Sequence, residues 1–277
     1  MSVTPPSDNL QRAVRLASIR PKQGLGQNFL IDEASLDLIA ATAAIKPEET
    51  VLEVGPGLGF LTTKLTPRAA QVVAVEADQQ LAEILTLEAP ANLRVITDDI
   101  LEFDLTTLPK SYKVVANIPY YLTSKLLRLL MENQNPPSSM TLLIQKEVAE
   151  RITAEPGQLS ILALSVQYYA YAKIVGIVER HKFWPSPNVD SAIITITRRP
   201  KPAFPADATK LFRIIKAGFG ERRKQLKNSL AGGLNADGEA ITRVLAQANI
   251  EATRRAQELT LDDWKRLYAA VTKENLV

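Results

Sequence analysis

The segment Asn117-Ile118-Pro119-Tyr120 carries the strongest chemical signal in the sequence, and it directly follows a short apolar run. Pro119 stiffens the turn and restricts Ile118 to an extended conformation, which turns the Asn117 amide and nearby backbone carbonyls toward one point. Converging acceptors suit an exocyclic amine, which has two N–H donors, and Tyr120 offers a flat face on which a base can stack. The segment therefore predicts a site for an aromatic amine. The alternative is an ordinary proline turn.

Such a site would serve group transfer to a nitrogen atom. An aromatic amine is a poor nucleophile because its lone pair is delocalised into the ring, and two acceptors that hold both N–H groups favour a more tetrahedral nitrogen. In-line transfer of a methyl group from a sulfonium needs no strong general base, so catalysis is mainly positioning, worth up to roughly 7–11 kcal/mol. Phe183, in the loop before the last expected strand, could close the other face of a flipped base. Alternatively, Phe183 or Trp184 is a core residue.

A glycine-rich loop indicates the methyl donor. Gly55, Gly57 and Gly59 follow an expected strand and precede a helix, so that the backbone can approach a ligand closely and offer it unpaired N–H groups. Glu76 ends the next strand, where a carboxylate can accept both hydroxyls of a ribose. The G-x-G-x-G spacing is tighter than that of dinucleotide-binding loops and favours a cofactor without a pyrophosphate, a description that S-adenosylmethionine fits. The alternative for the loop is a tight turn.

A third polar element, Thr97-Asp98-Asp99-Ile100, follows the third expected strand. A carboxylate of this segment could there accept a hydrogen bond from the adenine amino group of the cofactor. The alternative is that the aspartates cap a helix or a turn, as Asp often does.

Apolar runs that alternate with helical patterns must position these residues. The expected strands are Val51–Val54, Val72–Val75, Leu93–Ile96, Lys113–Ala116, Thr141–Ile144, Ile174–Val178 and Ile193–Thr197. The expected helices are 33–44, 59–66, 79–88, 123–132, 146–153 and 158–169. This alternation predicts the α/β class, a Rossmann-like methyltransferase fold whose seven-stranded, mostly parallel sheet has helices on both faces. No helix separates the last two strands, so we expect them to be antiparallel neighbours.

The stretch 198–205 indicates a linker, because its closely spaced prolines cannot continue a helix or a central strand. Beyond it only helical patterns occur, over 208–218, 221–231, 238–248 and 261–274. The sequence thus predicts an N-terminal tail over 1–20, a methyltransferase domain over 21–199 and a small all-helical domain over 207–277 that recognises RNA.

The composition excludes several classes of site. The 277 residues include no cysteine and one histidine, His181, which excludes disulfides, thiolate zinc sites, a cysteine nucleophile and an easily built Ser-His-Asp triad. We therefore expect no metal. No stretch approaches the roughly 20 apolar residues of a membrane span, and the N-terminus lacks the apolar run of a secretory signal. We expect a cytoplasmic protein without membrane contact, with a transit peptide over 1–20 as the open alternative.

Positive charge is concentrated in the last quarter of the chain. Residues 207–277 hold 13 Lys+Arg against 9 Asp+Glu, whereas the net charge of the whole chain is +3. A basic cluster within this region suits a polyanion. The predicted RNA contacts are Arg222, Arg223, Lys224 and Lys227. The alternative is a solvated helix face.

Five motifs occur in order along the chain: Gln23-Gly-Leu-Gly-Gln-Asn-Phe-Leu30, Glu53-Val-Gly-Pro-Gly-Leu-Gly59, Asn117-Ile-Pro-Tyr120, Leu143-Ile-Gln-Lys-Glu-Val148 and Phe183-x-Pro-x-Pro-x-Val-Asp-Ser191. Together with the basic segment 221–230, they resemble those of the rRNA adenine dimethyltransferase family, over nearly the whole chain from residue 20 onward. The resemblance implies S-adenosylmethionine-dependent transfer of two methyl groups to the amino nitrogen of adenosine in rRNA.

The resemblance also implies roles for individual residues. Asn117, Pro119 and Tyr120 would hold the target amine, and Phe183 would stack on the base. The residues that would contact the cofactor or frame its pocket are Asn28, Leu30, Gly55, Gly57, Glu76, Asp99, Ile100 and Asn117.

Two branches of that family differ in substrate. The housekeeping branch modifies two adjacent adenosines in a hairpin near the 3′ end of 16S (small-subunit) rRNA, late in subunit assembly, and the erythromycin-resistance branch modifies one adenosine of large-subunit rRNA. The first and fourth motifs and the basic segment look more like the housekeeping branch, which implies action on small-subunit rRNA or the pre-small ribosomal subunit. We expect the protein to be a monomer. The alternatives are the erythromycin-resistance type, a DNA adenine methyltransferase, an assembly or transcription factor that only binds RNA, and, disfavoured by the glycine spacing, a nicotinamide oxidoreductase.

Overall fold

The computed structural model describes residues 20–221 and 224–277. The expected tail up to residue 19 and two predicted RNA contacts, Arg222 and Arg223, lie outside the described residues. The chain divides into two compact units. Unit 1 comprises the residues up to Ala149 together with Lys173–Thr197, and unit 2 comprises Glu150–Ala172 together with Arg198–Val277.

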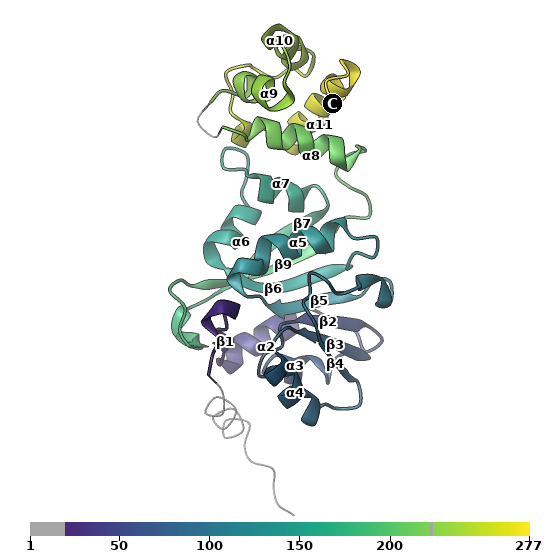
Figure 1. The fold of residues 1–277 in the computed structure, drawn as a ribbon, viewed down its shortest axis with the longest axis vertical. Coiled ribbons are helices and arrows are strands. Elements are labelled where there is room, and N and C mark those ends of the chain that lie inside the picture. Colours follow the sequence, from purple (N-terminus) through teal and green to yellow (C-terminus); the bar gives the residue numbers. More distant parts are fainter. Residues whose placement is uncertain (1–19, 222–223) are drawn as a thin grey trace, which may run out of the picture. The chain divides into compact units, whose positions relative to one another are not determined.

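A seven-stranded sheet with the order β4-β3-β2-β5-β6-β9-β7 builds most of unit 1, and Figure 1 draws the strands in this order from the bottom of the view upward. Strands β2 to β6 pair in parallel, and β9 runs antiparallel to β6. The strands are β2 (Thr50–Val54), β3 (Gln71–Glu76), β4 (Leu93–Thr97), β5 (Lys113–Asn117), β6 (Ser139–Gln145), β7 (Ala170–Val178) and β9 (Ser191–Arg198). The mostly parallel seven-stranded sheet is confirmed, and its last two strands are neighbours.

Helices pack around this sheet, each close to the position predicted from the sequence. They are α2 (Glu33–Thr42), α3 (Thr62–Leu65), α4 (Gln79–Leu87), α5 (Thr123–Glu132) and α6 (Lys146–Ile152). The remaining helix predicted before the linker, α7 (Ile161–Gln167), belongs to unit 2. Aspartate side chains cap the N-termini of α2 and α4: Asp32 accepts a hydrogen bond from the Ser35 N–H at 3.0 Å, and Asp78 accepts one from the Gln80 N–H at 3.2 Å. Short 3₁₀ turns, among them Gln23–Leu25 and Tyr120–Leu122, complete unit 1.

A second, two-stranded sheet joins distant parts of unit 1. In it β1 (Phe29–Leu30) pairs antiparallel with β8 (Phe183–Trp184). The Phe29 and Trp184 rings stack with their centroids 6.3 Å apart. The sequence did not predict this pairing, which brings the segment before α2 against the loop before β9.

Unit 2 is a helical bundle formed by α7, α8 (Ala208–Gly218), α9 (Leu226–Leu234), α10 (Gly238–Gln247) and α11 (Leu261–Lys273). Its core surrounds the fully buried Trp264 and includes Leu164 and Tyr168. For that reason 150–172 groups with this bundle, although the sequence analysis placed it in the domain over 21–199.

The helix predicted over 221–231 was wrong at its start. It begins at Leu226, whose N–H donates to the Arg254 carbonyl at 2.8 Å, and Lys224 lies before the helix, with its N–H donating to the Glu221 carbonyl at 3.0 Å.

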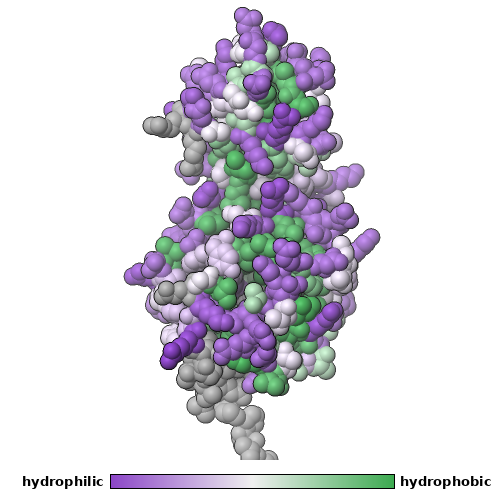
Figure 2. All heavy atoms as spheres, viewed as in Figure 1, coloured by the Kyte–Doolittle hydropathy of each residue, from purple (hydrophilic) through white to green (hydrophobic). Residues whose placement is uncertain are grey.

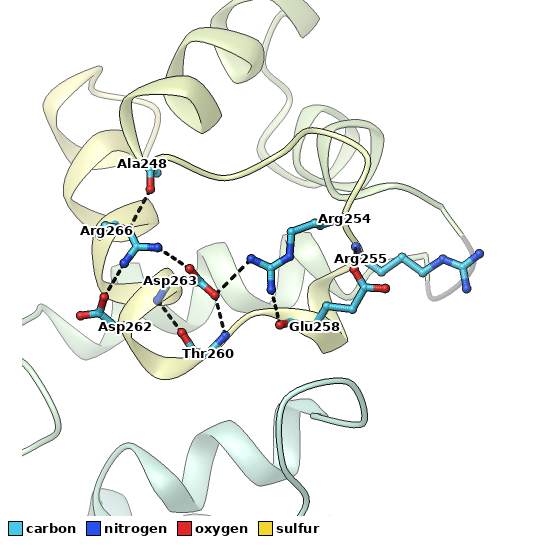
Figure 3. A network of polar contacts seen from close by, with 8 residues as sticks. All are labelled: Ala248, Arg254, Arg255, Glu258, Thr260, Asp262, Asp263 and Arg266. Atoms are coloured by element: carbon cyan, nitrogen blue, oxygen red, sulfur yellow. Dashed lines mark hydrogen bonds and ion pairs between the residues drawn. The ribbon is translucent and has the colours of Figure 1, made fainter.

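A buried carboxylate organises the start of α11, as Figure 3 shows. Asp263 accepts hydrogen bonds from the Thr260 N–H at 2.9 Å, from Arg254 Nη1 at 3.3 Å and from Arg266 Nη2. Its own N–H donates to Thr260 Oγ1 at 3.0 Å, which completes a capping box. Burial opposes ionisation of Asp263, but these hydrogen bonds and the two guanidinium charges outweigh it and lower its pKa.

Hydrophilic side chains cover most of the face drawn in Figure 2, with apolar residues scattered among them. Among the described residues, no helix is both long and apolar enough to cross a membrane.

Candidate active site

One pocket in unit 1 collects every residue that the sequence predicted for catalysis or cofactor binding. It lies where β2, β3 and β5 end, since parallel strands present their carboxyl ends at one edge of a sheet. Its lining includes Asn28, Leu30, Gly55, Gly57, Glu76, Asp99, Ile100, Asn117, Pro119, Tyr120 and Phe183. The structure therefore brings these residues together; their individual roles remain predictions.

The side chain of Asn117 is oriented as an acceptor. Its Nδ2 donates to the Asn28 carbonyl at 3.0 Å, which leaves Oδ1 available. Within the described chain, no hydrogen bond reaches Asn117 Oδ1 or the carbonyl of Ile118, whose N–H donates to the Leu143 carbonyl at 3.1 Å. Two carbonyl oxygens, one from a side chain and one from the backbone, are thus available at the end of β5.

Aromatic residues flank these acceptors. The Tyr120 hydroxyl lies 2.9 Å from Ser191 Oγ, which fixes the ring, and burial raises the pKa of Tyr120. Phe183 is 3% exposed and packs in the core of unit 1 while it lines the pocket. Trp184 stacks on Phe29 and does not line this pocket.

The glycine loop needs its glycines for two reasons. Gly55 and Gly57 have φ values of +63° and +57°, which side-chain-bearing residues rarely adopt. A Cβ at Gly57 would also lie 2.9 Å from the ring of Phe29. The loop is therefore held close against the pocket wall by a contact that leaves no room for a side chain.

The backbone fixes the carboxylate of Glu76, which is 7% exposed. Its Oε2 accepts from the Gly57 N–H at 3.0 Å and its Oε1 from the Asp78 N–H at 2.9 Å. Burial, the largest influence, raises the pKa of Glu76 in spite of these hydrogen bonds. Each oxygen keeps acceptor capacity for a ligand hydroxyl.

The position of Asp99 is compatible with both alternatives that the sequence left open. It lines the pocket, and its Oδ1 also accepts from the Leu101 N–H at 2.9 Å as a turn cap. The neighbouring Ile100 is buried and adds an apolar wall.

Two acidic residues near the pocket were not predicted from the sequence. Glu53, in β2, is 1% exposed, and burial raises its pKa to about 8. Asp78 accepts from Lys22 Nζ at 2.8 Å and from Gln27 Nε2 at 2.9 Å, which ties the segment before β1 to the end of β3. An acid inside an otherwise apolar strand was the signal that could have revealed Glu53.

The predicted RNA contacts that the structure describes lie in unit 2. Lys224 pairs with Glu221 at 2.7 Å, and Lys227 lies near the start of α9. His181 is exposed, pairs with Glu179 at 3.3 Å and does not line the pocket. Across the described ranges, no group of three or more His, Asp or Glu side chains is arranged to hold a metal ion.

Comparisons with known proteins agree on one family. The family model described as "Ribosomal RNA adenine dimethylase" matches residues 19–267. A relative named "Ribosomal RNA small subunit methyltransferase A" from Dehalococcoides mccartyi is 41% identical over 263 residues, which cover 92% of this chain and 90% of that protein. The protein of the same name from Oceanobacillus iheyensis is 42% identical over 262 residues, covering 89% of this chain and 88% of its own.

Solved structures show the same fold. A dimethyladenosine transferase from Plasmodium falciparum superposes with a TM-score of 0.79 at 26% identity, covering 89% of this chain and 98% of that one. The 23S rRNA methyltransferase ErmE superposes with a TM-score of 0.71 at 29% identity, covering 88% of this chain and 99% of that one.

Proposed function

Since the chain belongs to the ribosomal RNA adenine dimethylase family, we propose that it methylates the N6 amines of two adjacent adenosines in a hairpin near the 3′ end of small-subunit rRNA. It is an S-adenosylmethionine-dependent rRNA methyltransferase. The name of the curated relatives supports the small subunit over the large one. The proposal includes action as a monomer, in the cytoplasm, late in assembly of the small subunit.

The donor end of the pocket fits S-adenosylmethionine. Glu76, fixed by two backbone N–H groups, would accept the ribose hydroxyls, and Asp99 would accept from the adenine amine beside Ile100. The glycine loop lines the pocket at Gly55 and Gly57, where the absence of side chains would let the backbone lie close to a ligand. When bound, the cofactor supplies a methyl group activated by a sulfonium. The acidic lining complements its positive charge.

The observation that carries the proposal is the orientation of Asn117. Because Nδ2 is held by the Asn28 carbonyl, Oδ1 and the Ile118 carbonyl would accept the two N–H groups of an adenine amine. Tyr120 would stack on the base, and Phe183 would close its other face. Positioning of this kind is the main contribution that the chain makes to a reaction that needs no strong base.

We propose that the second unit recognises the RNA. Arg222, Arg223, Lys224 and Lys227 would neutralise phosphates, as the basic segment of the family suggests. With this assignment the methyltransferase domain over 21–199 carries the chemistry and the domain over 207–277 carries recognition.

The proposal is tested with rRNA from a strain that lacks the protein. Pre-small subunits, a large-subunit rRNA fragment and duplex DNA are each incubated with the protein and labelled methyl donor, then digested and analysed by mass spectrometry. We expect two dimethyladenosines in the small-subunit RNA and none in the other substrates. Label in a single large-subunit adenosine would favour the erythromycin-resistance type, and label in DNA would reject the proposal.

A further inference from the structure

A second cavity adjoins the active-site pocket within unit 1. Asn28 and Tyr120 line both cavities, whereas Gln145, Trp184 and Asn188 line only the second. The proposed methyl transfer uses none of those three side chains. The two cavities therefore meet at the residues that are expected to hold the target base.

The two cavities differ in charge. The active-site pocket is lined by the acidic residues Glu76, Asp98 and Asp99, and this lining suits a cationic donor; Glu53 also lines it, but its pKa of about 8 keeps it mostly protonated near neutral pH. Among the described residues, no acid lines the second cavity. An RNA strand can therefore occupy it without repulsion between phosphate and carboxylate at its walls.

The second cavity also offers side-chain amides. Gln145 ends β6 and Asn188 lies in the loop before β9, and in the described part of the chain neither amide has a hydrogen-bond partner. Asn and Gln amides pair with two edge atoms of adenine, accepting from its amine and donating to a ring nitrogen. Trp184, half-buried beside them, adds an aromatic surface for stacking.

Hydrogen bonds hold the walls of this cavity in place. Gln145 pairs with Ser191 in the β6–β9 register, and the Ser191 hydroxyl lies 2.9 Å from that of Tyr120. The loop that carries Asn188 is fixed at Asp190, whose carboxylate accepts from the Arg180 N–H at 3.0 Å. A preformed wall loses little conformational freedom when a base binds.

We propose that this second cavity binds the base next to the target adenosine in the same RNA strand, and that Gln145 and Asn188 select adenine at that position. Consecutive bases are joined by one phosphodiester, and the shared residue Tyr120 places the second cavity at the target base. The inference rests on the proposed function, because it needs an RNA substrate whose target base occupies the first pocket.

The test combines protein variants with RNA variants. The full chain methylates the rRNA hairpin and two derivatives in which one or the other adenosine of the pair is replaced by purine riboside, which lacks the amine. In the derivative whose purine riboside falls in the second cavity, kcat/KM for the remaining adenosine is expected to be about tenfold lower than on the native hairpin in the wild type. Gln145→Ala and Asn188→Ala are expected to lower kcat/KM on the native hairpin by a similar factor, with no further loss on that derivative.

Gln71→Ala serves as the control, since Gln71 is an exposed glutamine of unit 1 that lines neither cavity. It is expected to match the wild type on every RNA, and calorimetry with S-adenosylhomocysteine is expected to give one affinity for all the proteins. If the factors by which kcat/KM falls for a protein variant and for an RNA derivative multiply when the two are combined, the inference is overturned, because a merely structural role of the side chain gives that result. Wild-type rates for both variants would overturn it as well. A wild type that methylates no hairpin would instead refute the proposed function.

Discussion

One buried acid of unit 1, Glu53, and one buried acid of unit 2, Asp263, differ in their hydrogen bonds and in the direction of their pKa shifts. Glu53 of unit 1 has an oxygen, Oε2, without a hydrogen-bond partner in the described chain, and burial raises the pKa of this residue to about 8. Asp263 of unit 2, which is 6% exposed, is held by a capping box and two arginines, and its pKa lies below the ordinary value. These two residues therefore differ, because one oxygen of Glu53 has no hydrogen-bond partner in the described chain, whereas both oxygens of Asp263 accept hydrogen bonds.

The two acids differ in function, because Glu53 lies at the active-site pocket and Asp263 stabilises the start of α11. A buried acid with an unsatisfied oxygen costs stability, and Glu53, which carries this cost, lines the active-site pocket. Asp263 lines no such pocket and connects the start of α11 to Arg254 and Arg266. The acid with a raised pKa thus lies at the pocket, whereas the acid with a lowered pKa stabilises the start of a helix.

The largest effect on the active site is expected from a substitution of Asn117. Asn117→Ala removes an acceptor for the target amine and is expected to lower kcat about thousandfold, as loss of a preorganised hydrogen-bonding group does. Affinity for the RNA hairpin should stay within a few-fold of the wild type, because phosphate contacts dominate binding. Single-turnover methylation and filter binding measure the two quantities. Turnover within about tenfold of the wild type would remove Asn117 from its proposed role.

The unsatisfied acid itself is tested by Glu53→Gln. Because the pKa of Glu53 rises from 4.5 to about 8 on folding, the native state binds more protons than the unfolded state across that range. The free energy of unfolding therefore falls as pH rises through it. Glu53→Gln removes this dependence, which is on the order of a few kcal/mol.

Urea unfolding at several pH values measures the slope for both proteins. Glu76 contributes in the same direction and is present in both, so the difference between the slopes isolates Glu53. Parallel slopes would mean that Glu53 is ionised in the native state.

The satisfied acid is tested by Asp263→Asn. Asparagine keeps the shape and a cap acceptor, but it leaves Arg254 and Arg266 without their shared charge. We expect a loss of about 1–3 kcal/mol, below the value for a fully buried pair because both arginines are partly exposed. Since folding lowers the pKa of Asp263, its contribution is present above the ordinary pKa and is lost as pH falls below it.

Fluorescence of the buried Trp264, measured in a Trp184→Phe background because Trp184 lies in unit 1, reports unfolding of this unit. Affinity for S-adenosylhomocysteine should not change in Asp263→Asn. Unaltered stability would show that the two guanidinium charges contribute little in water.

The residues at strand ends could be predicted because local rules place them. Asn117 and Glu76 each end a parallel strand, and all such ends lie at one edge of a sheet. The glycine loop could be predicted because its positive φ values require glycine, the residue type that the sequence shows there.

Features that depend on tertiary contacts could not be predicted. The two-residue strands of the Phe29–Trp184 pairing are too short to show a period. The free oxygen of Glu53 and the start of α9 at Leu226 depend on neighbours distant in sequence. The packing of Leu164 on the C-terminal core likewise gave no local signal.

The smallest expected effect concerns the basic segment, where one of two lysines has an ion pair in the described chain and the other has none. Lys224 is neutralised by Glu221 at 2.7 Å, whereas Lys227 has no ion pair among the described residues. If unpaired charges mark the sites that bind ligands, Lys227→Gln should reduce the slope of log affinity for RNA against log salt by about 0.7–0.9, the value for one phosphate contact. Lys224→Gln should change it less, because Glu221 already competes for that charge. A larger effect at Lys224 would mean that its ion pair opens when RNA binds, and unchanged slopes in both variants would place the RNA surface elsewhere.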